Sequence, residues 1–194
     1  MTEKSKKILV HTCCAACAGY VVPILIRNGF APVCFFDHPE VDDQAEFANR
    51  LESVRAYCKE NEIELVESDF GSDELRQLIE PFKNPASIKC ISDRDRYRRR
   101  RCLLCNTLAI QKTIEAARKK RIKYFTTTLL CSPYKDFDQI VEVANEKSLD
   151  YNLTFYYQDF RKGYWTGRNY ARNHQAYIPR YCGCLDSEKE KRLE

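Results

Sequence analysis

The chain has 194 residues, a formal net charge of +4 and a hydrophobic fraction of 44%. This length can bury a substantial core, and 12 tyrosines with 10 phenylalanines exclude a disordered chain. No apolar run approaches the roughly 20 residues of a membrane span, and residues 1–7 lack the apolar region of a signal peptide. We therefore expect a single domain over residues 1–194 in the cytoplasm.

Short apolar runs alternate with amphipathic stretches along the chain. The apolar runs predict strands over 7–12, 31–36, 63–67, 123–130 and 153–157. Periodicity and capping residues predict helices over 18–28, 42–61, 72–80, 94–120, 138–148 and 163–177. Gly29 fits the C-terminal cap of the first helix, and Pro23 is expected in its first turns. Residues 82–93 are predicted to form a loop.

This alternation predicts an α/β fold, a parallel sheet with helices on both faces. Ligands of such sheets collect at the carboxyl ends of the strands, near a switch in strand order. Cys13 and Cys14 follow the first strand, Asp37 follows the second, and Cys131 and Ser132 follow the fourth. We expect these residues to lie at one edge of the sheet.

Eleven cysteines in a reducing compartment favour metal binding or redox catalysis over stable disulfides. Cys102 and Cys105 begin a predicted helix, where a spacing of three places both sulfurs on one face. Such a pair suits two ligands of one metal centre or a redox dithiol. The arginine-rich run 94–101 precedes it, and guanidinium groups stabilise thiolates. The same run is equally typical of a solvated helix face.

Cys13 and Cys14 are adjacent, so their side chains point in different directions and reach a large cluster more easily than one small ion. With Cys102 and Cys105 they provide four thiolates, which suits a four-iron cluster or a tetrahedral zinc. The ligand geometry favours iron–sulfur over zinc. Cys17 completes a CxxC spacing with Cys14, and its role stays open.

Cys182 and Cys184 flank one glycine, a spacing too short for an easy helical pair. They either form a strained, redox-active disulfide or provide two ligands to a second metal ion. Gly183 supplies the backbone freedom that such a ring needs. The isolated thiols Cys34, Cys58 and Cys131 are expected to be structural, Cys90 is a loop thiol, and His11 suits core packing at least as well as ligation.

Four segments resemble the cobalamin-independent epoxyqueuosine reductases, the QueH family. They are His11–Cys17, Arg101–Cys105, Tyr124–Leu129 with Ser132-Pro133, and Tyr181–Cys184. Their order and approximate spacing are kept over nearly the whole chain. The resemblance implies an adenine-nucleotide α-hydrolase-like (HUP-type) fold. It also implies reduction of the epoxide of epoxyqueuosine to the alkene of queuosine, at the wobble position of tRNA.

The resemblance further implies a [4Fe–4S] cluster bound by Cys13, Cys14, Cys102 and Cys105. Cys182 and Cys184 would be the redox-active pair, or would help bind an additional iron ion. The electron donor is not identified by the sequence. Where the family carries a Tyr-Asn-Pro-Asn-type turn after the second strand, this chain has Phe-Asp-His-Pro-Glu over residues 36–40.

The implied reaction takes two electrons and two protons and releases water. We hypothesise that iron acts as a Lewis acid on the epoxide oxygen, while the cluster and the Cys182/Cys184 pair supply electrons. The candidate proton donors are Asp37, His38 and Tyr134. The basic runs 94–101 and 118–121 are candidate phosphate contacts. The candidate stacking partners of an unpaired anticodon base are Tyr164, Trp165 and Tyr170.

Two other functions fit parts of the sequence. A non-enzymatic zinc protein would bind nucleic acid through its basic face and would be colourless. A tRNA-thiolating enzyme of related fold would depend on ATP, yet no phosphate-binding glycine loop is visible in the sequence.

Overall fold

The computed structural model describes residues 5–41, 43–71, 77–78, 91–184 and 187. The side chains of residues 91–95, among them Arg94, are outside this description. The predicted helix over 72–80 lies largely outside the described residues, as do Cys90 and most of the predicted loop over 82–93.

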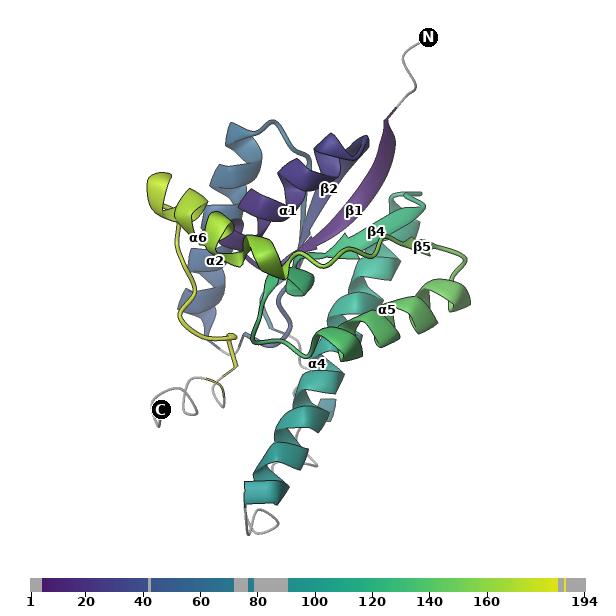
Figure 1. Ribbon diagram of the computed structural model, residues 1–194, viewed down its shortest axis with the longest axis vertical. Coiled ribbons are helices and arrows are strands. Elements are labelled where there is room, and N and C mark those ends of the chain that lie inside the picture. The colour runs from purple at the N-terminus through teal and green to yellow at the C-terminus, as the bar shows by residue number, and fades with distance from the viewer. Residues whose placement is uncertain (1–4, 42, 72–76, 79–90, 185–186, 188–194) are drawn as a thin grey trace.

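Five strands form one parallel sheet (Figure 1). They are β1 (Lys6–Thr12), β2 (Phe30–Phe36), β3 (Leu65–Glu67), β4 (Tyr124–Thr127) and β5 (Thr154–Phe155), in the order β3-β2-β1-β4-β5. β1 is central, and its residues Ile8, Leu9 and Val10 are fully buried because helices cover both faces of the sheet.

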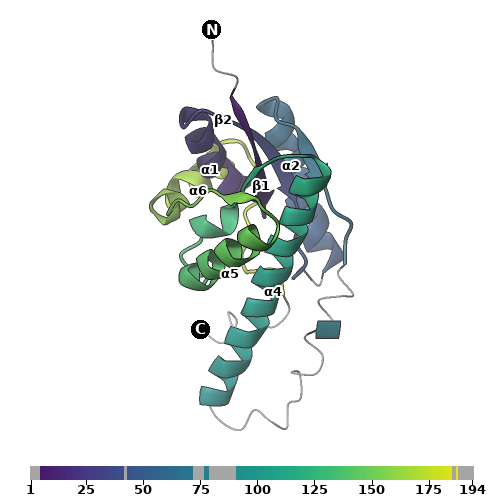
Figure 2. The same cartoon turned by 90° about the vertical axis from the view of Figure 1, so that its right-hand side faces the viewer.

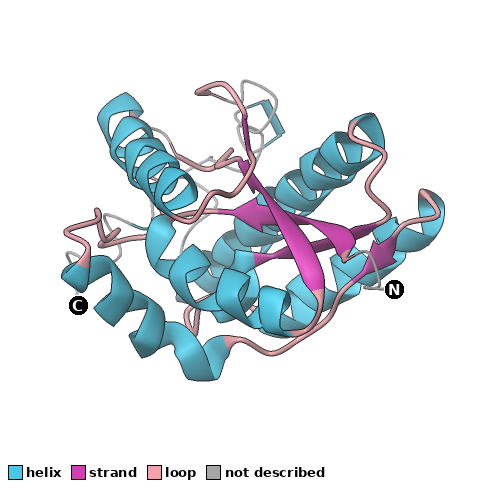
Figure 3. Cartoon of the chain, turned by 90° about the horizontal axis from the view of Figure 1, so that it is seen from above, coloured by secondary structure: helices cyan, strands magenta, loops and turns pink. Residues whose placement is uncertain are grey.

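Five helices in the described part of the chain surround the sheet. They are α1 (Ala15–Arg27), α2 (Gln44–Glu60), α4 (Ile91–Lys119), α5 (Phe137–Asp150) and α6 (Tyr164–Asn173), with short 3-10 helices η3 (Thr128–Cys131) and η4 (Arg161–Gly163). α1 packs between α2 and α6 on one face, and α4 packs against α5 on the other (Figures 2 and 3). The predicted α/β architecture is confirmed, and the HUP-type assignment stays a prediction. None of the described helices is long and apolar enough to cross a membrane.

The strand order places a switch between β1 and β4. The chain leaves β1 toward β3 on one side and returns to β4 on the other, so the connections diverge at the carboxyl ends of these two strands. Crevices at such points are the usual ligand sites of open parallel sheets. The amino-terminal end of α4 projects well past the sheet on the same side (Figure 1).

The first helix begins three residues earlier than predicted. Cys14 is the N-cap of α1, and Cys17 lies in its first turn. Ala15 and Ala16 are strong helix formers, which allows the helix to start directly after the two cysteines. Pro23 consequently lies in the helix interior rather than in the first turns, so the carbonyl of Gly19 has no helical donor there.

The fourth strand was predicted to reach Leu130 but ends at Thr127. The hydroxyl of Thr127 accepts a hydrogen bond from the backbone N–H of Leu129 at 3.1 Å, which caps the short helix η3. The hydroxyl of Thr128 accepts from the backbone N–H of Cys13 at 3.1 Å. These bonds turn the chain out of the strand and tie the ends of β1 and β4 together.

Candidate functional site

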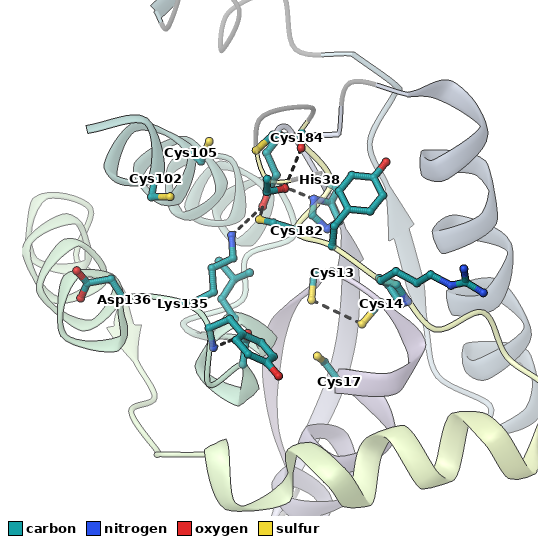
Figure 4. A pocket seen from close by; sticks show the side chains of 18 of the residues that line it. Cys13, Cys14, Cys17, His38, Cys102, Cys105, Lys135, Asp136, Cys182 and Cys184 are labelled. Atoms are coloured by element: carbon teal, nitrogen blue, oxygen red, sulfur yellow. Dashed lines mark hydrogen bonds and ion pairs between the residues drawn. The ribbon is translucent and has the colours of Figure 1, made fainter. Parts of the chain in front are cut away.

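A cavity of about 770 Å³ lies at the carboxyl ends of β1 and β4 (Figure 4). Seven cysteines line it, and they are Cys13, Cys14, Cys17, Cys102, Cys105, Cys182 and Cys184. They come from the β1–α1 corner, from α4 and from the segment that follows α6. The structure thus brings together all six cysteines that the sequence singled out, while their roles as ligands or redox groups stay a prediction.

Cys13, Cys14 and Cys17 form the tightest sulfur group. Their Sγ atoms lie within 4.8 Å of one another, close enough to hold one metal ion. Cys17 joins the pair because α1 begins at Ala15, which places it one turn after the N-cap Cys14. The positive end of the α1 dipole favours thiolates at this position. Hydrogen bonds among the three thiols and their burial nevertheless raise the pKa of each of them.

Burial has the largest effect on the pKa values of three further cavity thiols. It raises the pKa of Cys102, Cys105 and Cys182. The charges of Lys135, Arg101 and Arg98 lower the pKa of Cys102 by less than burial raises it. The predicted effect of the arginine run is therefore present but is not the largest one. At neutral pH these three thiols are therefore protonated, and a metal ion would have to displace their protons in order to bind them.

A chain of buried polar groups lies beside Cys182. Nζ of Lys135 is 3.1 Å from Oε1 of Glu40, and Oε2 of Glu40 is 3.0 Å from Nδ1 of His38. The Cys182 thiol donates to Oε1 of Glu40 at 3.9 Å. Figure 4 shows Lys135 and His38 on either side of Cys182.

His38 is a neutral acceptor in this arrangement. Burial lowers the pKa of His38 to about 4. Its Nε2 accepts a hydrogen bond from Arg50, so the single proton of the neutral ring resides on Nδ1, facing Glu40.

Arg50 of α2 holds the segment that carries Cys182. Its guanidinium donates to the carbonyl oxygens of Tyr181 at 2.8 Å and Cys182 at 3.1 Å. Nε donates to Glu46 at 2.6 Å, and the whole side chain is buried. Glu46 also accepts from the hydroxyl of Tyr177, which ties α2 to the same segment a second time.

Gly183 allows the backbone between the two cysteines to pass close to α2. Its φ is +119°, and a Cβ at this position would lie 2.7 Å from Cγ2 of Val41. The conformation of Gly183 is thus one that favours glycine, as predicted, and the nearby Val41 side chain leaves no room for a larger residue.

Several candidates lie away from the cavity. His11 bonds to Thr127 at 2.8 Å and to the Asp37 carbonyl at 2.9 Å, so it joins strand ends inside the core. Asp37 itself pairs with Lys112 at 3.7 Å and does not line the cavity. Cys34, Cys58 and Cys131 are buried and likewise absent from its wall, as expected of structural thiols. The basic run 118–121 precedes β4 and lies at the opposite edge of the sheet.

The family model described as "Epoxyqueuosine reductase QueH" matches residues 8–190. The chain belongs to the QueH family. Three curated proteins named "Epoxyqueuosine reductase QueH" are similar to it. The protein from Dehalococcoides mccartyi is 28% identical over 185 residues, covering 95% of this chain and 94% of that protein. The Thermotoga maritima protein is 27% identical, with 95% and 92% covered, and the Acinetobacter baylyi protein is 23% identical, with 98% and 84% covered.

The part of the chain that matches the QueH family model contains the whole cavity wall. Every residue that lines the cavity lies within the matched range, including all seven cysteines. Sequence reasoning toward the QueH family had not singled out Arg50, Glu40 or Lys135. Glu40 follows β2, and Lys135 follows η3 at the end of β4. Their positions after strand ends could have indicated that they lie at the site. Arg50 lies within a helix, where nothing in the sequence distinguishes it from a solvent-facing arginine.

Proposed function

We propose that this chain reduces the epoxide of epoxyqueuosine in tRNA to the alkene of queuosine. Membership of the QueH family carries the proposal, and the thiol-lined cavity at the sheet switch supports it. The substrate would be a tRNA that presents its wobble base to this cavity.

We further propose that Cys13, Cys14, Cys102 and Cys105 bind a [4Fe–4S] cluster, with Cys182 and Cys184 as a redox-active pair or as ligands of an additional iron. The donor set fits, since the cavity wall is rich in sulfur and carries the cationic groups of Arg50, Arg101 and Lys135 to balance thiolate charge. When bound, a cluster supplies electrons one at a time, and an additional iron supplies Lewis acidity.

If Cys182 and Cys184 act as the redox pair, their two thiols supply all the electrons and protons that the reduction of the epoxide consumes. Their oxidation to a disulfide releases two electrons and two protons. The epoxide takes up both, loses its oxygen as water and becomes an alkene. A separate electron donor must then reduce the disulfide before the next turnover.

Lys135 is the side chain placed to stabilise negative charge on the departing oxygen. Its ammonium group interacts with the Cys182 thiol and is held by Glu40. Among the three candidate proton donors, Asp37 does not line the cavity. His38 has its pKa lowered to about 4 by burial and directs its proton at Glu40. Tyr134 lines the cavity and stays a candidate donor.

The test uses anaerobically purified protein, a chemical reductant and tRNA that carries epoxyqueuosine. Digestion of the tRNA and mass spectrometry of its nucleosides should show queuosine appearing as epoxyqueuosine disappears. Cys182→Ala and Cys184→Ala should each abolish turnover, and full turnover by both would refute their redox role. A colourless protein that contains zinc without sulfide would support the zinc-protein alternative, and ATP-dependent sulfur incorporation would support the thiolating one.

A further inference from the structure

Three of the aromatic side chains that line the cavity contact one another. Tyr134 follows η3, and Tyr164 and Trp165 begin α6, and all three line the cavity wall. Tyr134 is 74% exposed and Trp165 is 62% exposed. We call these three residues the aromatic rim. Large exposed rings beside a cavity are unusual in a folded chain and indicate a surface that binds something.

The rings of the aromatic rim contact one another edge to face. The Tyr134 and Tyr164 centroids are 5.8 Å apart at 81°, and those of Tyr164 and Trp165 are 5.2 Å apart at 74°. Tyr164 is thus the middle ring, and it holds the two exposed rings in place. Rings held this way lose little conformational entropy when a flat ligand stacks on them.

α6 holds the rim at a fixed place relative to the sulfur group. A Cβ on Gly167 would lie 2.1 Å from the carbonyl oxygen of Ala16, so only glycine permits this approach of α6 to α1. Ala16 is the neighbour of Cys17. The rim is therefore anchored directly on the helix turn that carries Cys14 and Cys17.

Tyr170 does not belong to this surface, although it was a candidate, together with Tyr164 and Trp165, for stacking on an unpaired base. Its ring stacks on His174 at 4.1 Å and contacts Tyr57 at 5.6 Å. Its hydroxyl donates to Glu60 at 3.2 Å, and it does not line the cavity. α6 directs Tyr170 toward α2 rather than toward the cysteines, so the structure does not place it beside the cavity with Tyr164 and Trp165.

Positive charge lies on both sides of the rim. Arg168 lies over the Tyr164 ring at 5.6 Å from its centroid, and its Nε is buried without a hydrogen-bond partner among the described residues. Arg98 and Arg99 of α4 are exposed and line the same cavity. Exposed aromatic faces flanked by arginines are the composition of surfaces that bind single-stranded nucleic acid.

We propose that the aromatic rim is a stacking subsite for an unpaired base of the RNA loop, adjacent to the base that enters the cavity. The inference rests on the proposed function, because a loop base must approach the cavity for its neighbour to reach the rim. The ligand class is an unpaired nucleobase, recognised by its π face rather than by base-edge hydrogen bonds. Arg98 and Arg99 would contact phosphates on the other side of the cavity.

The chain contains one tryptophan, so the fluorescence of Trp165 reports on the rim alone. An unmodified anticodon stem-loop RNA is titrated into the cluster-loaded protein, with a fully paired duplex of equal length as the comparison. The stem-loop should quench Trp165 fluorescence saturably, and the duplex should not. Equal quenching by both RNAs, or stem-loop binding detected by filter retention without any quenching, would overturn the proposal.

Substitutions test the same surface by affinity. Tyr134→Ala and Trp165→Ala should each weaken stem-loop binding about tenfold while leaving its salt dependence unchanged, because no charge is removed. Trp165→Phe keeps a stacking ring and should retain most of the affinity, which separates stacking from misfolding. Tyr157→Ala is the matched control, since Tyr157 is 54% exposed but does not line the cavity. A Tyr157→Ala effect equal to that of Tyr134→Ala would refute a localised subsite.

The design separates this proposal from the proposed function, since the unmodified stem-loop contains no epoxide and is not reduced. Turnover of modified tRNA with no effect of the rim variants on affinity would refute the subsite alone. Quenching that depends on the unpaired loop, in a protein that produces no queuosine, would refute the reductase activity alone.

Discussion

Nζ of Lys135 lies 3.1 Å from Oε1 of Glu40, beside the thiol of Cys182. The Glu40 side chain is 4% exposed and that of Lys135 is 13% exposed, so this is a buried ion pair. A buried carboxylate next to the cavity cysteines would oppose the binding of further negative charge. Lys135 offsets that charge, and its ammonium group lines the cavity.

Removal of the Lys135 charge should therefore damage both stability and turnover. In Lys135→Met, the Glu40 carboxylate loses its cation, and we expect a loss of about 3 kcal/mol in the free energy of unfolding of the metal-free protein. Urea denaturation measures this value. The double variant with Glu40→Gln should recover much of the stability but not the turnover. A double variant as unstable as Lys135→Met would show that the two residues are not coupled, and exposed Lys123→Met is the control.

Arg50 should control the access of reagents to the Cys182 segment. Arg50→Lys keeps a positive charge near Glu46 but loses the fork of donors that binds the carbonyls of Tyr181 and Cys182. We expect a loss of about 3 kcal/mol in stability, since hydrogen bonds to charged groups contribute about 1.5–3 kcal/mol each. Cys182 should react with a thiol reagent at least about tenfold faster, because local opening then needs less free energy.

The control for Arg50 is Arg55→Lys on the same helix. Arg55 is half-exposed and pairs with Glu67 at the surface, so its replacement should leave both stability and thiol reactivity unchanged. If Arg50→Lys behaved like Arg55→Lys, the hydrogen bonds to the segment would have no role in holding it.

The sheet and the gathering of the cysteines could be predicted from the sequence. Buried strands read as continuous apolar runs, and the carboxyl ends of parallel strands meet at one edge, so residues that follow β1 and η3 must approach each other. The cysteine spacings then drew attention to α4 and to the segment at Cys182. Topology alone does not place Cys102, Cys105 or the Cys182 segment, and their association with Cys13 and Cys14 followed from the count of thiolate ligands and from the resemblance to the QueH family.

The polar side chains around the cysteines could not be predicted in the same way. Lys135 and Glu40 are 95 residues apart, and Arg50 and Cys182 are 132 residues apart, so no local pattern links them. The position of Cys17 was missed for a different reason. The Cys-Cys-Ala-Ala stretch reads equally well as a loop or a helix start, and a shift of three residues in that start moves Cys17 beside the pair.

Gly183 should tolerate no side chain. Gly183→Ala combines a left-handed φ of +119° with a Cβ that would lie 2.7 Å from Val41. We expect displacement of the Cys182/Cys184 backbone and loss of most turnover. Gly71→Ala is a matched control, because Gly71 has a φ of +88° but open space around it. Both variants carry backbone strain of order 1 kcal/mol, so a larger effect of Gly183→Ala in urea denaturation isolates the contact. Equal effects would contradict it.

The burial of His38 predicts a pH dependence of stability. Burial lowers its pKa from an ordinary value of 6.5 to about 4. As the pH falls through this window, the unfolded state binds a proton that the folded state does not, so stability decreases. The decrease attributable to His38 should reach about 3 kcal/mol near pH 4. Urea denaturation between pH 7 and pH 4 measures it.

His38→Gln offers an amide oxygen to Arg50 in place of Nε2 and cannot take up this proton. Its stability should therefore fall less steeply than that of the unmodified protein over the same pH range. Parallel curves for His38→Gln and the unmodified protein would mean that the pKa of His38 is the same in the folded and the unfolded states.

The iron and sulfide content of cysteine variants should show which of the seven cavity cysteines bind a cluster. Ser substitution of any proposed ligand, such as Cys13 or Cys105, should lower the iron and sulfide content of anaerobically purified protein to less than about half and remove the brown absorption near ~400 nm. Cys34→Ser is the control, because Cys34 is buried outside the cavity. Cys17→Ser is the most informative variant, since Cys17 lies within 4.8 Å of both neighbours but is not among the proposed ligands. Iron retained in Cys17→Ser supports the proposed set of four. If Cys17→Ser loses its iron while Cys102→Ser keeps it, the metal ligands would instead be Cys13, Cys14 and Cys17.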